Sequence, residues 1–386
     1  MTRQSSAAGD RLFESAPQNG IQRRLGMDGF RIGRCKLLIL ITWAPLVALT
    51  LAQSLVWGPE QIVSLLHGIE THIRYLIVAP LLVYADKQCA PALGAIVRHF
   101  VDTGIVPPHE RARFENIISS TRRLLETPVA QVAVIVLAYL MAAAAVHSSM
   151  DQVPFWHQSS GSLVFSPAGW WHVLVSIPLL LILFLGWVWR LALWARLLWG
   201  VSRLDLQLIA AHADGAAGLG FLGYSLRAFA SVGLAFSSAA AARSVREVSQ
   251  GAELSTLHNY FSLGWLVFLA ILFAAPLLAF TPILINTWRR GIFEYGALAR
   301  REGKVFERKW LGPDAMIDES ALELQDFSAT NDLYQIVSNV YAMRFFPLSL
   351  KDILILIAAM LLPFVPILLI AIPADMILVW IKGLLL

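Results

Sequence analysis

Charged residues are scarce in this chain. Only 15% of its 386 residues are Asp, Glu, Lys or Arg, whereas 57% are hydrophobic. Soluble domains carry charge at about a quarter of their positions and are about half apolar. The apolar residues gather in runs of roughly 20, the length that a helix needs to cross the hydrocarbon of a bilayer. The composition therefore argues against a soluble domain and indicates a lipid environment.

Alternation of polar and apolar residues is also missing. The apolar runs are broken by Gly and Pro but show no period of two, so they do not predict barrel strands. The expected fold is all-α, a polytopic transmembrane helical bundle with cytosolic helical extensions. The net charge is +4, but the basic residues flank apolar runs and do not form a polar surface with aromatics. The predicted partner is thus the lipid bilayer, with no nucleic acid.

Residues and motifs typical of catalysis are few. There is no HExxH, GxSxG or Walker sequence, and the nine histidines are scattered singly. No catalytic residue, metal site or cofactor is predicted. The two cysteines, Cys35 and Cys89, fall at predicted cytosolic ends of spans. Because the cytosol is reducing, both are expected to be free thiols.

The apolar runs divide the chain into a tail and a membrane domain. Residues 1–34 are predicted to be a disordered cytosolic tail, and residues 35–386 a transmembrane domain. The first run begins at Leu37, later than in a cleavable signal peptide, so it is interpreted as a retained span. About seven spans are expected, at about 37–57, 62–85, 129–147, 171–189, 221–242, 258–288 and 352–372. Cytosolic helices are expected at about 90–126 and 289–345, and an outer interfacial tail at 373–386.

The orientation follows from the distribution of Lys and Arg. The loop from Ser148 to Gly169 contains neither, and Trp156, Trp170 and Trp171 lie where an interfacial aromatic belt is expected. A dense basic run follows span six. The positive-inside rule then places the N-terminus in the cytosol and favours an odd number of spans.

Span two contains polar residues at helical spacing. His67, Glu70, Thr71 and Arg74 stand at i, i+3, i+4 and i+7, on one helical face. If Asp86 marks the inner boundary, Arg74 lies about 18 Å from it, within the hydrocarbon. An ionisable group at that depth is a candidate for a transport pathway. The alternative is that residues 61–74 form an outer amphipathic helix with a solvated ion pair, and the sequence leaves both open.

Small residues dominate span five. Ser237 and Ser238 are candidates for a hydroxyl-lined pathway. Gly233 and Ser237 stand at the spacing that lets helix backbones approach closely, which favours a packing role.

The loop before span five contains Asp205, His212 and Asp214, which are predicted to collect at a cytosolic helix terminus. Such side chains could bind a cation or a proton. The favoured interpretation is structural, with Asp214 capping span five in a tight reversal. Gly218, Gly220 and Gly223 match the dinucleotide-binding pattern, but no strand precedes them, so no nucleotide site is predicted.

Four segments carry a resemblance to a known family. They are the loop His-x-Asp-Gly-Ala-x-Gly-Leu-Gly-Phe-Leu at 212–222, Phe306–Trp310, Leu324–Leu333 and Met343–Pro347. Together they resemble an uncharacterised family of bacterial polytopic inner-membrane proteins. The resemblance implies a bacterial cytoplasmic membrane and no established activity, so it transfers no site residue. The inside start, seven spans and long cytosolic helices are also similar to insect odorant-receptor channels, in topology alone and without a shared motif.

The functional hypothesis is a channel or transporter for ions or small solutes, expected to be a homo-oligomer. Spans two, four, five and six are predicted to form its pathway, because the Pro breaks of span six predict irregular backbone, which usually lines a cavity. The main alternative is a membrane scaffold or sensor whose cytosolic helices recruit a protein partner. An intramembrane enzyme is a remote third hypothesis.

Overall fold

Seven helices in the described part of the chain are long and apolar enough to span a membrane. The computed structural model describes residues 31–148, 155–159, 162–249, 256–312 and 326–367. Within these ranges the candidate spans are Gly33–Trp57, Ile69–Asp102, Pro128–His147, Pro167–Val201, Gly220–Val245, Ser262–Trp310 and Leu350–Ile367. The protein is therefore an all-α, multi-pass membrane protein, as the apolar runs predict.

The first part of the chain forms the first three spans. Its elements are α3 (Arg31–Thr42), α4 (Ala44–Trp57), α5 (Glu60–His67), α6 (Ile69–His72), η1 (Ile73–Val78), α7 (Ala79–Asp102), η2 (Pro108–Glu110), α8 (Arg111–Glu126) and α9 (Pro128–Ser148). The segment η1 is π-helical, and η2 is a turn of 3-10 helix.

The second part supplies the other four spans. It consists of η4 (Phe155–His157), β1 (Gln158–Ser159), β2 (Ser162–Phe165), α10 (Pro167–Trp171), η5 (His172–Ser176), α11 (Ile177–Val201), η6 (Gly220–Gly223), α12 (Tyr224–Ser249), α13 (Thr256–Ala274), η7 (Ala275–Phe280), α14 (Thr281–Trp310), α15 (Asp326–Tyr341), α16 (Leu350–Leu361) and η9 (Leu362–Phe364). The short strands β1 and β2 pair antiparallel. The segment η5 is π-helical, and η4, η6, η7 and η9 are 3-10 turns.

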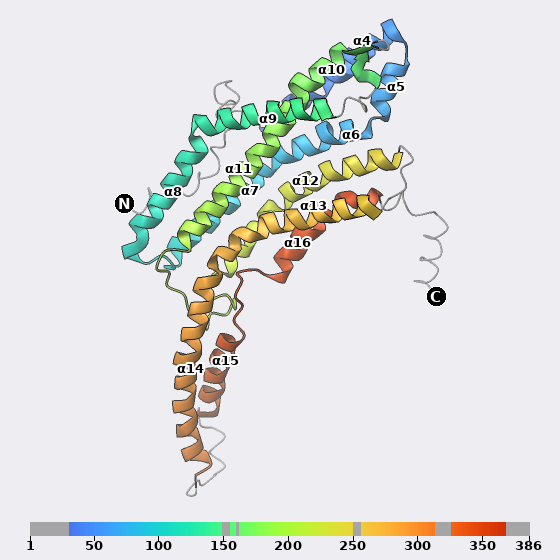
Figure 1. The fold of residues 1–386 in the computed structure, drawn as a ribbon. Helices are drawn as coiled ribbons and strands as arrows, with labels where there is room; N and C mark the ends of the chain where they lie inside the picture. Colours follow the sequence, from blue (N-terminus) through green and yellow to red (C-terminus); the bar gives the residue numbers. More distant parts are fainter. Residues whose placement is uncertain (1–30, 149–154, 160–161, 250–255, 313–325, 368–386) are drawn as a thin grey trace, which may run out of the picture.

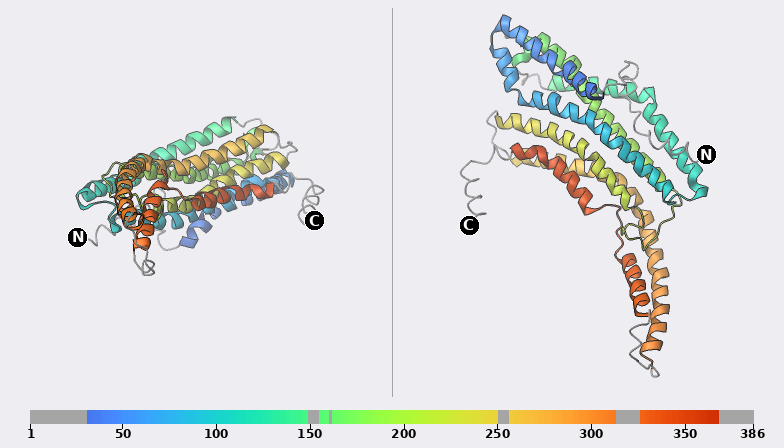
Figure 2. Two further views of the ribbon diagram at one scale, coloured as in Figure 1. Left: turned by 90° about the horizontal axis from the view of Figure 1, so that it is seen from below. Right: turned by 180° about the vertical axis from the view of Figure 1, so that it is seen from behind.

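The spans lie side by side, and one helical hairpin projects from the bundle (Figure 1). The hairpin consists of α14 and α15, which run along each other, and Phe327 of α15 packs 4.8 Å from Trp310 of α14 between ring centroids. The helices α4, α5 and α10 lie at the opposite end of the bundle in all three views (Figures 1 and 2). The two ends are called below the hairpin end and the α5 end.

The first span begins earlier than the sequence predicts. Helix α3 starts at Arg31, so residues 31–34 belong to a helix and not to the predicted tail. The helix is interrupted at Trp43, two residues before Pro45, which has no N–H to continue the hydrogen-bond ladder. Residues 1–30 lie outside the described residues.

The second span differs from the predicted range 62–85. Helix α5 is separate and ends at Gly68, where the backbone leaves the helical region at ψ 60°. The spanning helix then runs without a break from Ile69 to Asp102 through α6, η1 and α7. The predicted cytosolic helix 90–126 is likewise two helices, because α7 ends at Asp102 and α8 begins at Arg111.

The predicted aromatic belt is only partly correct. Trp170 is exposed on α10, but Trp156 is 1% exposed and is part of the core. Its ring packs 5.2 Å from the ring of His172, between centroids. Burial against another helix therefore takes this side chain away from the interface that its sequence position suggests.

Proline residues bend the sixth span, as predicted. Pro276 stands within the 3-10 segment η7, and Pro282 within the first turn of α14. Each removes a backbone N–H, so the regular i to i−4 hydrogen bonds are interrupted there. The seventh span consists of α16 and η9, and the predicted interfacial tail 373–386 lies outside the described residues.

Two charge pairs join helices inside the bundle. Arg190 of α11 is 3% exposed, and its Nη1 lies 2.8 Å from Asp86 Oδ1 of α7. Arg227 of α12 pairs with Asp352 of α16, whose side chain is 4% exposed. Asp86 thus does not mark a solvated boundary, because its carboxylate faces a buried guanidinium.

Candidate functional site

Two spans change to π-helix at the α5 end of the bundle. The segments are η1, between α6 and α7, and η5, between α10 and α11, and helix α3 packs against both. Each is followed two residues later by a proline, Pro80 or Pro178. Proline lacks the N–H that would bond to the carbonyl four residues earlier, so the helix widens before it. The freed carbonyl of Leu174 accepts a hydrogen bond from Tyr139 Oη at 3.1 Å.

Polar side chains, all but Arg74 buried, gather at and beside these segments. The π-segment cluster consists of Glu70, Arg74, Tyr75, His157 and His172. His172 Nδ1 lies 2.8 Å from His157 Nε2, a hydrogen bond between two imidazoles. The ring of Tyr75 stands edge-on to His172, with centroids 5.7 Å apart. Tyr75 Oη and His172 Nε2 are buried, and neither finds a hydrogen-bond partner among the described residues.

The predicted polar face of span two is only partly formed. Glu70 and Arg74 form an ion pair within one helix, with side chains 11% and 35% exposed. Thr71 lies half-buried on α6 between them. His67 does not share this face, because Gly68 ends α5 and His67 is exposed on that separate helix. In the structure, three of the four predicted residues therefore lie on one helix. His67 does not, and the histidines of the π-segment cluster are His157 and His172.

A further histidine, His72, connects helices at the α5 end. Trp43 Nε1 donates to His72 Nδ1 at 3.0 Å, and His72 Nε2 lies 3.0 Å from the carbonyl oxygen of Leu65. Because the indole N–H can only donate, His72 Nδ1 must accept and the ring proton lies on Nε2. The neutral ring thus joins the first span, α5 and α6 beside the π-segment cluster.

The contacts of the span-five serines fit a role in helix packing better than a role in lining a pathway. Ser238 Oγ donates to Leu234 O of its own helix at 2.7 Å. Ser237 is fully buried, and its hydroxyl has no partner in the described part of the chain. A Cβ on Gly233 would lie 3.0 Å from Met360 Cγ, so α12 and α16 approach closely here.

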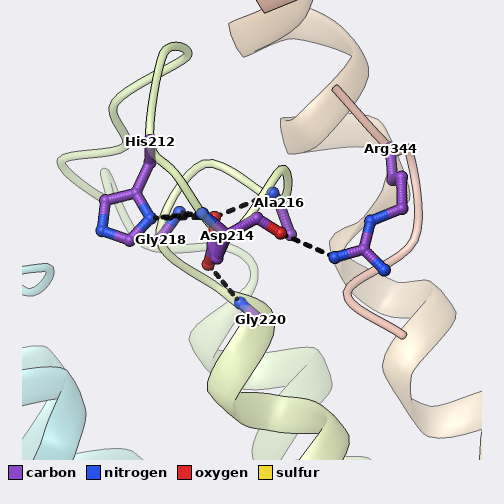
Figure 3. Close-up of polar contacts among 6 residues, drawn as sticks. All are labelled: His212, Asp214, Ala216, Gly218, Gly220 and Arg344. Atoms are coloured by element: carbon purple, nitrogen blue, oxygen red, sulfur yellow. Dashed lines mark hydrogen bonds and ion pairs between the residues drawn. The ribbon is translucent and has the colours of Figure 1, made fainter. Parts of the chain in front are cut away.

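The loop at the hairpin end is organised by one carboxylate (Figure 3). Asp214 Oδ1 accepts from the backbone N–H groups of Ala216 at 2.8 Å and Gly218 at 3.1 Å. Its Oδ2 accepts from the N–H of Gly220, the first residue of η6, at 2.7 Å. His212 Nδ1 lies 2.9 Å from Oδ1. This is the geometry of a cap and tight reversal at the start of span five.

These bonds also explain why the glycine pattern is no nucleotide site. The amides of Gly218 and Gly220 would have to face a phosphate in the dinucleotide fold. Here they are occupied by the carboxylate of Asp214. Gly218 has φ 93°, a left-handed conformation that suits glycine, and a Cβ on Gly220 would lie 2.9 Å from Asp214 Oδ2.

Asp205 does not join this loop. Its side chain is 84% exposed, and its carboxylate lies 3.8 Å from His109 Nε2. The predicted collection of Asp205, His212 and Asp214 is therefore wrong for Asp205, because the chain between residues 205 and 212 turns it toward η2. Within the described ranges, no group of three His, Cys, Asp or Glu residues could hold a metal ion. Both cysteines are free thiols, as predicted.

The segments that carry the family resemblance pair in space. Arg344, from Met343–Pro347, donates through Nη2 to the carbonyl oxygen of Asp214 at 2.6 Å (Figure 3). Its Nη1 donates to the carbonyl oxygen of Leu348. Phe306 and Trp310 likewise pack against Phe327 of the Leu324–Leu333 segment. The four segments thus pair two by two. The loop 212–222 contacts Met343–Pro347 at the base of the projecting hairpin, and Phe306–Trp310 contacts Leu324–Leu333 along it.

Acid is expected to weaken the Asp214 loop. Partial burial acts to raise the pKa of Asp214, but the N–H groups of Ala216, Gly220 and Gly218 and the His212 ring outweigh it, so its pKa is lowered. A depressed carboxylate pKa contributes stability above the unfolded value near 3.9, which is lost as pH falls through the folded pKa. The thermal unfolding midpoint of the detergent-solubilised protein should therefore fall below about pH 4.

The Asp214→Asn variant tests the same bonds at neutral pH. One amide oxygen can keep only part of the acceptor set, and the NH2 group then opposes a backbone N–H, so unfolding should become easier by about 1–3 kcal/mol. The matched control is Asp205→Asn, which alters an exposed carboxylate. Equal unfolding midpoints for the two variants would contradict the capping role.

Sequence reasoning overlooked the histidine pair and Tyr75. His157 and His172 stand 15 positions apart in or beside the loop from Ser148 to Gly169, a spacing that predicts no contact between them. The available signal was the pair of prolines, Pro80 and Pro178, each inside an apolar run. Proline there predicts irregular helix and freed backbone groups, which mark functional sites more often than regular helix does.

Comparison with known proteins returns no relative. No protein-family model, curated protein or solved structure matches the chain.

Proposed function

We propose that the protein is a channel or transporter for ions or small solutes, with the π-segment cluster on its pathway. The observation that carries this proposal is the group of largely buried ionisable side chains at and beside two π-helical segments of different spans. Charged or titratable groups inside a membrane domain are costly, and they generally mark ion or proton pathways. Irregular backbone at membrane depth belongs to the same class of site.

The chemistry of the cluster suits a mobile cation or proton. When one of these two imidazoles takes up a proton and becomes imidazolium, a proton can pass to the other along the bond between His157 and His172. His172 Nε2 and Tyr75 Oη offer polar atoms that no described residue occupies. Glu70 and Arg74 supply a carboxylate and a guanidinium in the same segment. The buried Asp86–Arg190 pair lies further along the same two spans.

The cellular setting belongs to the same proposal. The family resemblance supports a bacterial cytoplasmic membrane, and the positive-inside rule supports a cytosolic hairpin end. We further propose a homo-oligomer, whose contacts would use part of the apolar surface that the spans expose, including Leu55 at 84% and Val129 at 71%. Lipid or a second copy would cover these side chains.

Water access to the cluster tests its place on a pathway. In a background of Cys35→Ser and Cys89→Ala, a Tyr75→Cys thiol should react with a small cationic methanethiosulfonate reagent during opening of the pathway. The control is Phe273→Cys, at a side chain 1% exposed within an aromatic cluster with Phe229. We expect faster modification at position 75 in proteoliposomes. Equal, slow modification at both positions would contradict the proposal.

A scaffold or sensor is the second candidate, and the projecting hairpin favours it. Helix α14 continues from the sixth span to Trp310 and carries exposed basic side chains, among them Arg301 and Lys304. Such a surface suits a cytosolic protein partner or anionic lipid. A protein that binds the full chain, but not a variant lacking residues 313–340, would favour this alternative.

A further inference from the structure

An apolar groove runs between spans four and six. Its volume is about 910 Å³, and its walls come from α11 on one side and α13, η7 and α14 on the other. On α11 the residues Val188, Leu191, Ala195 and Trp199 follow each other at helical spacing. The groove lies beside the prolines of span six, where the chain departs from a regular helix.

One end of the groove differs from the rest. Ser202 and Arg203 close it at the hairpin end, just after α11 ends at Val201. The Arg203 Cζ lies 4.8 Å from the centre of the Trp199 ring, a cation–π contact that holds the guanidinium over the groove. In the part of the chain that the structure describes, no ion pair joins Arg203 to a carboxylate. Its N–H donors therefore remain for a ligand.

We propose that this groove binds one anionic phospholipid, with an acyl chain along the apolar walls and the phosphate at Arg203. A planar guanidinium matches phosphate oxygens with two parallel hydrogen bonds. Trp199 is 58% exposed beside it, a position typical of tryptophan at the headgroup level. From Val188 to its end at Val201 the helix rises about 20 Å, which reaches from the headgroups to the middle of the bilayer.

The charge of the site selects among membrane lipids. An anionic headgroup gains the attraction of Arg203, whereas a zwitterionic headgroup places its own cation near the guanidinium. A basic residue at an anionic surface contributes about 1 kcal/mol, which corresponds to about a fivefold preference. Lipid binding at this groove does not require transport, so it can be tested separately from the pathway proposed above.

The test is lipid binding by native mass spectrometry. The full-length protein in nonionic detergent is titrated with phosphatidylglycerol and with phosphatidylcholine of the same acyl chains. We expect about fivefold tighter binding of phosphatidylglycerol, and loss of that preference in Arg203→Gln. The matched control is Arg111→Gln, which removes an exposed arginine at the start of α8 that does not line the groove. The control should retain the preference.

A second variant tests the groove itself. Ala192 is exposed and lines the apolar wall, so Ala192→Trp should fill the groove without disturbing the core and weaken binding of both lipids. Unchanged binding in this variant, or a preference that survives Arg203→Gln, would overturn the proposal. If Ala192→Trp instead dissociates an oligomer and leaves lipid binding intact, the occupant is a second copy of the chain and the lipid site is refuted.

Discussion

Replacing Asp86 with leucine is expected to lower the free energy of unfolding by about 3–5 kcal/mol, because it leaves a buried guanidinium without its partner. Arg190 is 3% exposed and stacks on the Trp187 ring at 4.5 Å. An arginine cannot lose its proton at neutral pH, so the protein cannot avoid the cost by neutralising the group. Its Nε and Nη2 already lack partners among the described residues. Unfolding of the purified protein in mixed detergent measures the effect.

The double variant Asp86→Leu, Arg190→Leu separates the pair from the packing around it. Apolar residues in place of both charges usually cost little, so most of the lost stability should return. Asp102→Leu is the matched control, since Asp102 is an exposed carboxylate at the end of the same helix. It should change stability by no more than about 0.5 kcal/mol. A double variant no more stable than Asp86→Leu alone would contradict the account of this pair.

The number of spans was predictable because it depends on local properties. A run of about 20 apolar residues must form a helix in lipid, whatever its neighbours are. The bends at Pro276 and Pro282 were predictable for the same reason, since proline removes its own N–H wherever it stands. The seven candidate spans accordingly follow the runs, with differences concentrated at helix ends.

The helix ends were harder to predict. The sequence around Gly68 reads as one apolar run with polar residues at helical spacing, so it favours a single helix. In the structure His72 binds both Trp43 and Leu65 O, and these contacts hold a reversal at Gly68. Tertiary contacts of this kind leave no local pattern in the sequence. They separate His67 from Glu70 and thereby change the predicted site.

The partners of the buried charges could not be predicted from the sequence either. Asp86 and Arg190 are about a hundred positions apart, and each stands near the end of an apolar run, where a charge ordinarily marks the interface. Only the packing of α7 on α11 brings them together. Asp214 is the opposite case, because its acceptor bonds reach residues two, four and six positions ahead, so the cap could be proposed from the sequence.

Loss of the Glu70–Arg74 pair is expected to have the largest effect on transport. Substitution of either residue breaks this ion pair within a membrane helix, a cost of roughly 2.5 kcal/mol or more. If the conducting state is destabilised by this free energy, flux should drop between about tenfold and a hundredfold. Glutamine in place of each residue retains a polar side chain of similar reach, so packing changes little.

Flux is therefore the measurement that tests the central claim most directly. The wild type, Glu70→Gln and Arg74→Gln are reconstituted into liposomes, and proton flux is followed with an entrapped pH dye. K⁺ and Cl⁻ currents of the same proteins are recorded in planar bilayers. The control is His67→Gln, an exposed side chain on the separate helix α5. The account predicts flux for the wild type and the control and a large loss in both cluster variants. Absence of flux from the wild type, or equal flux in all four proteins, would contradict it.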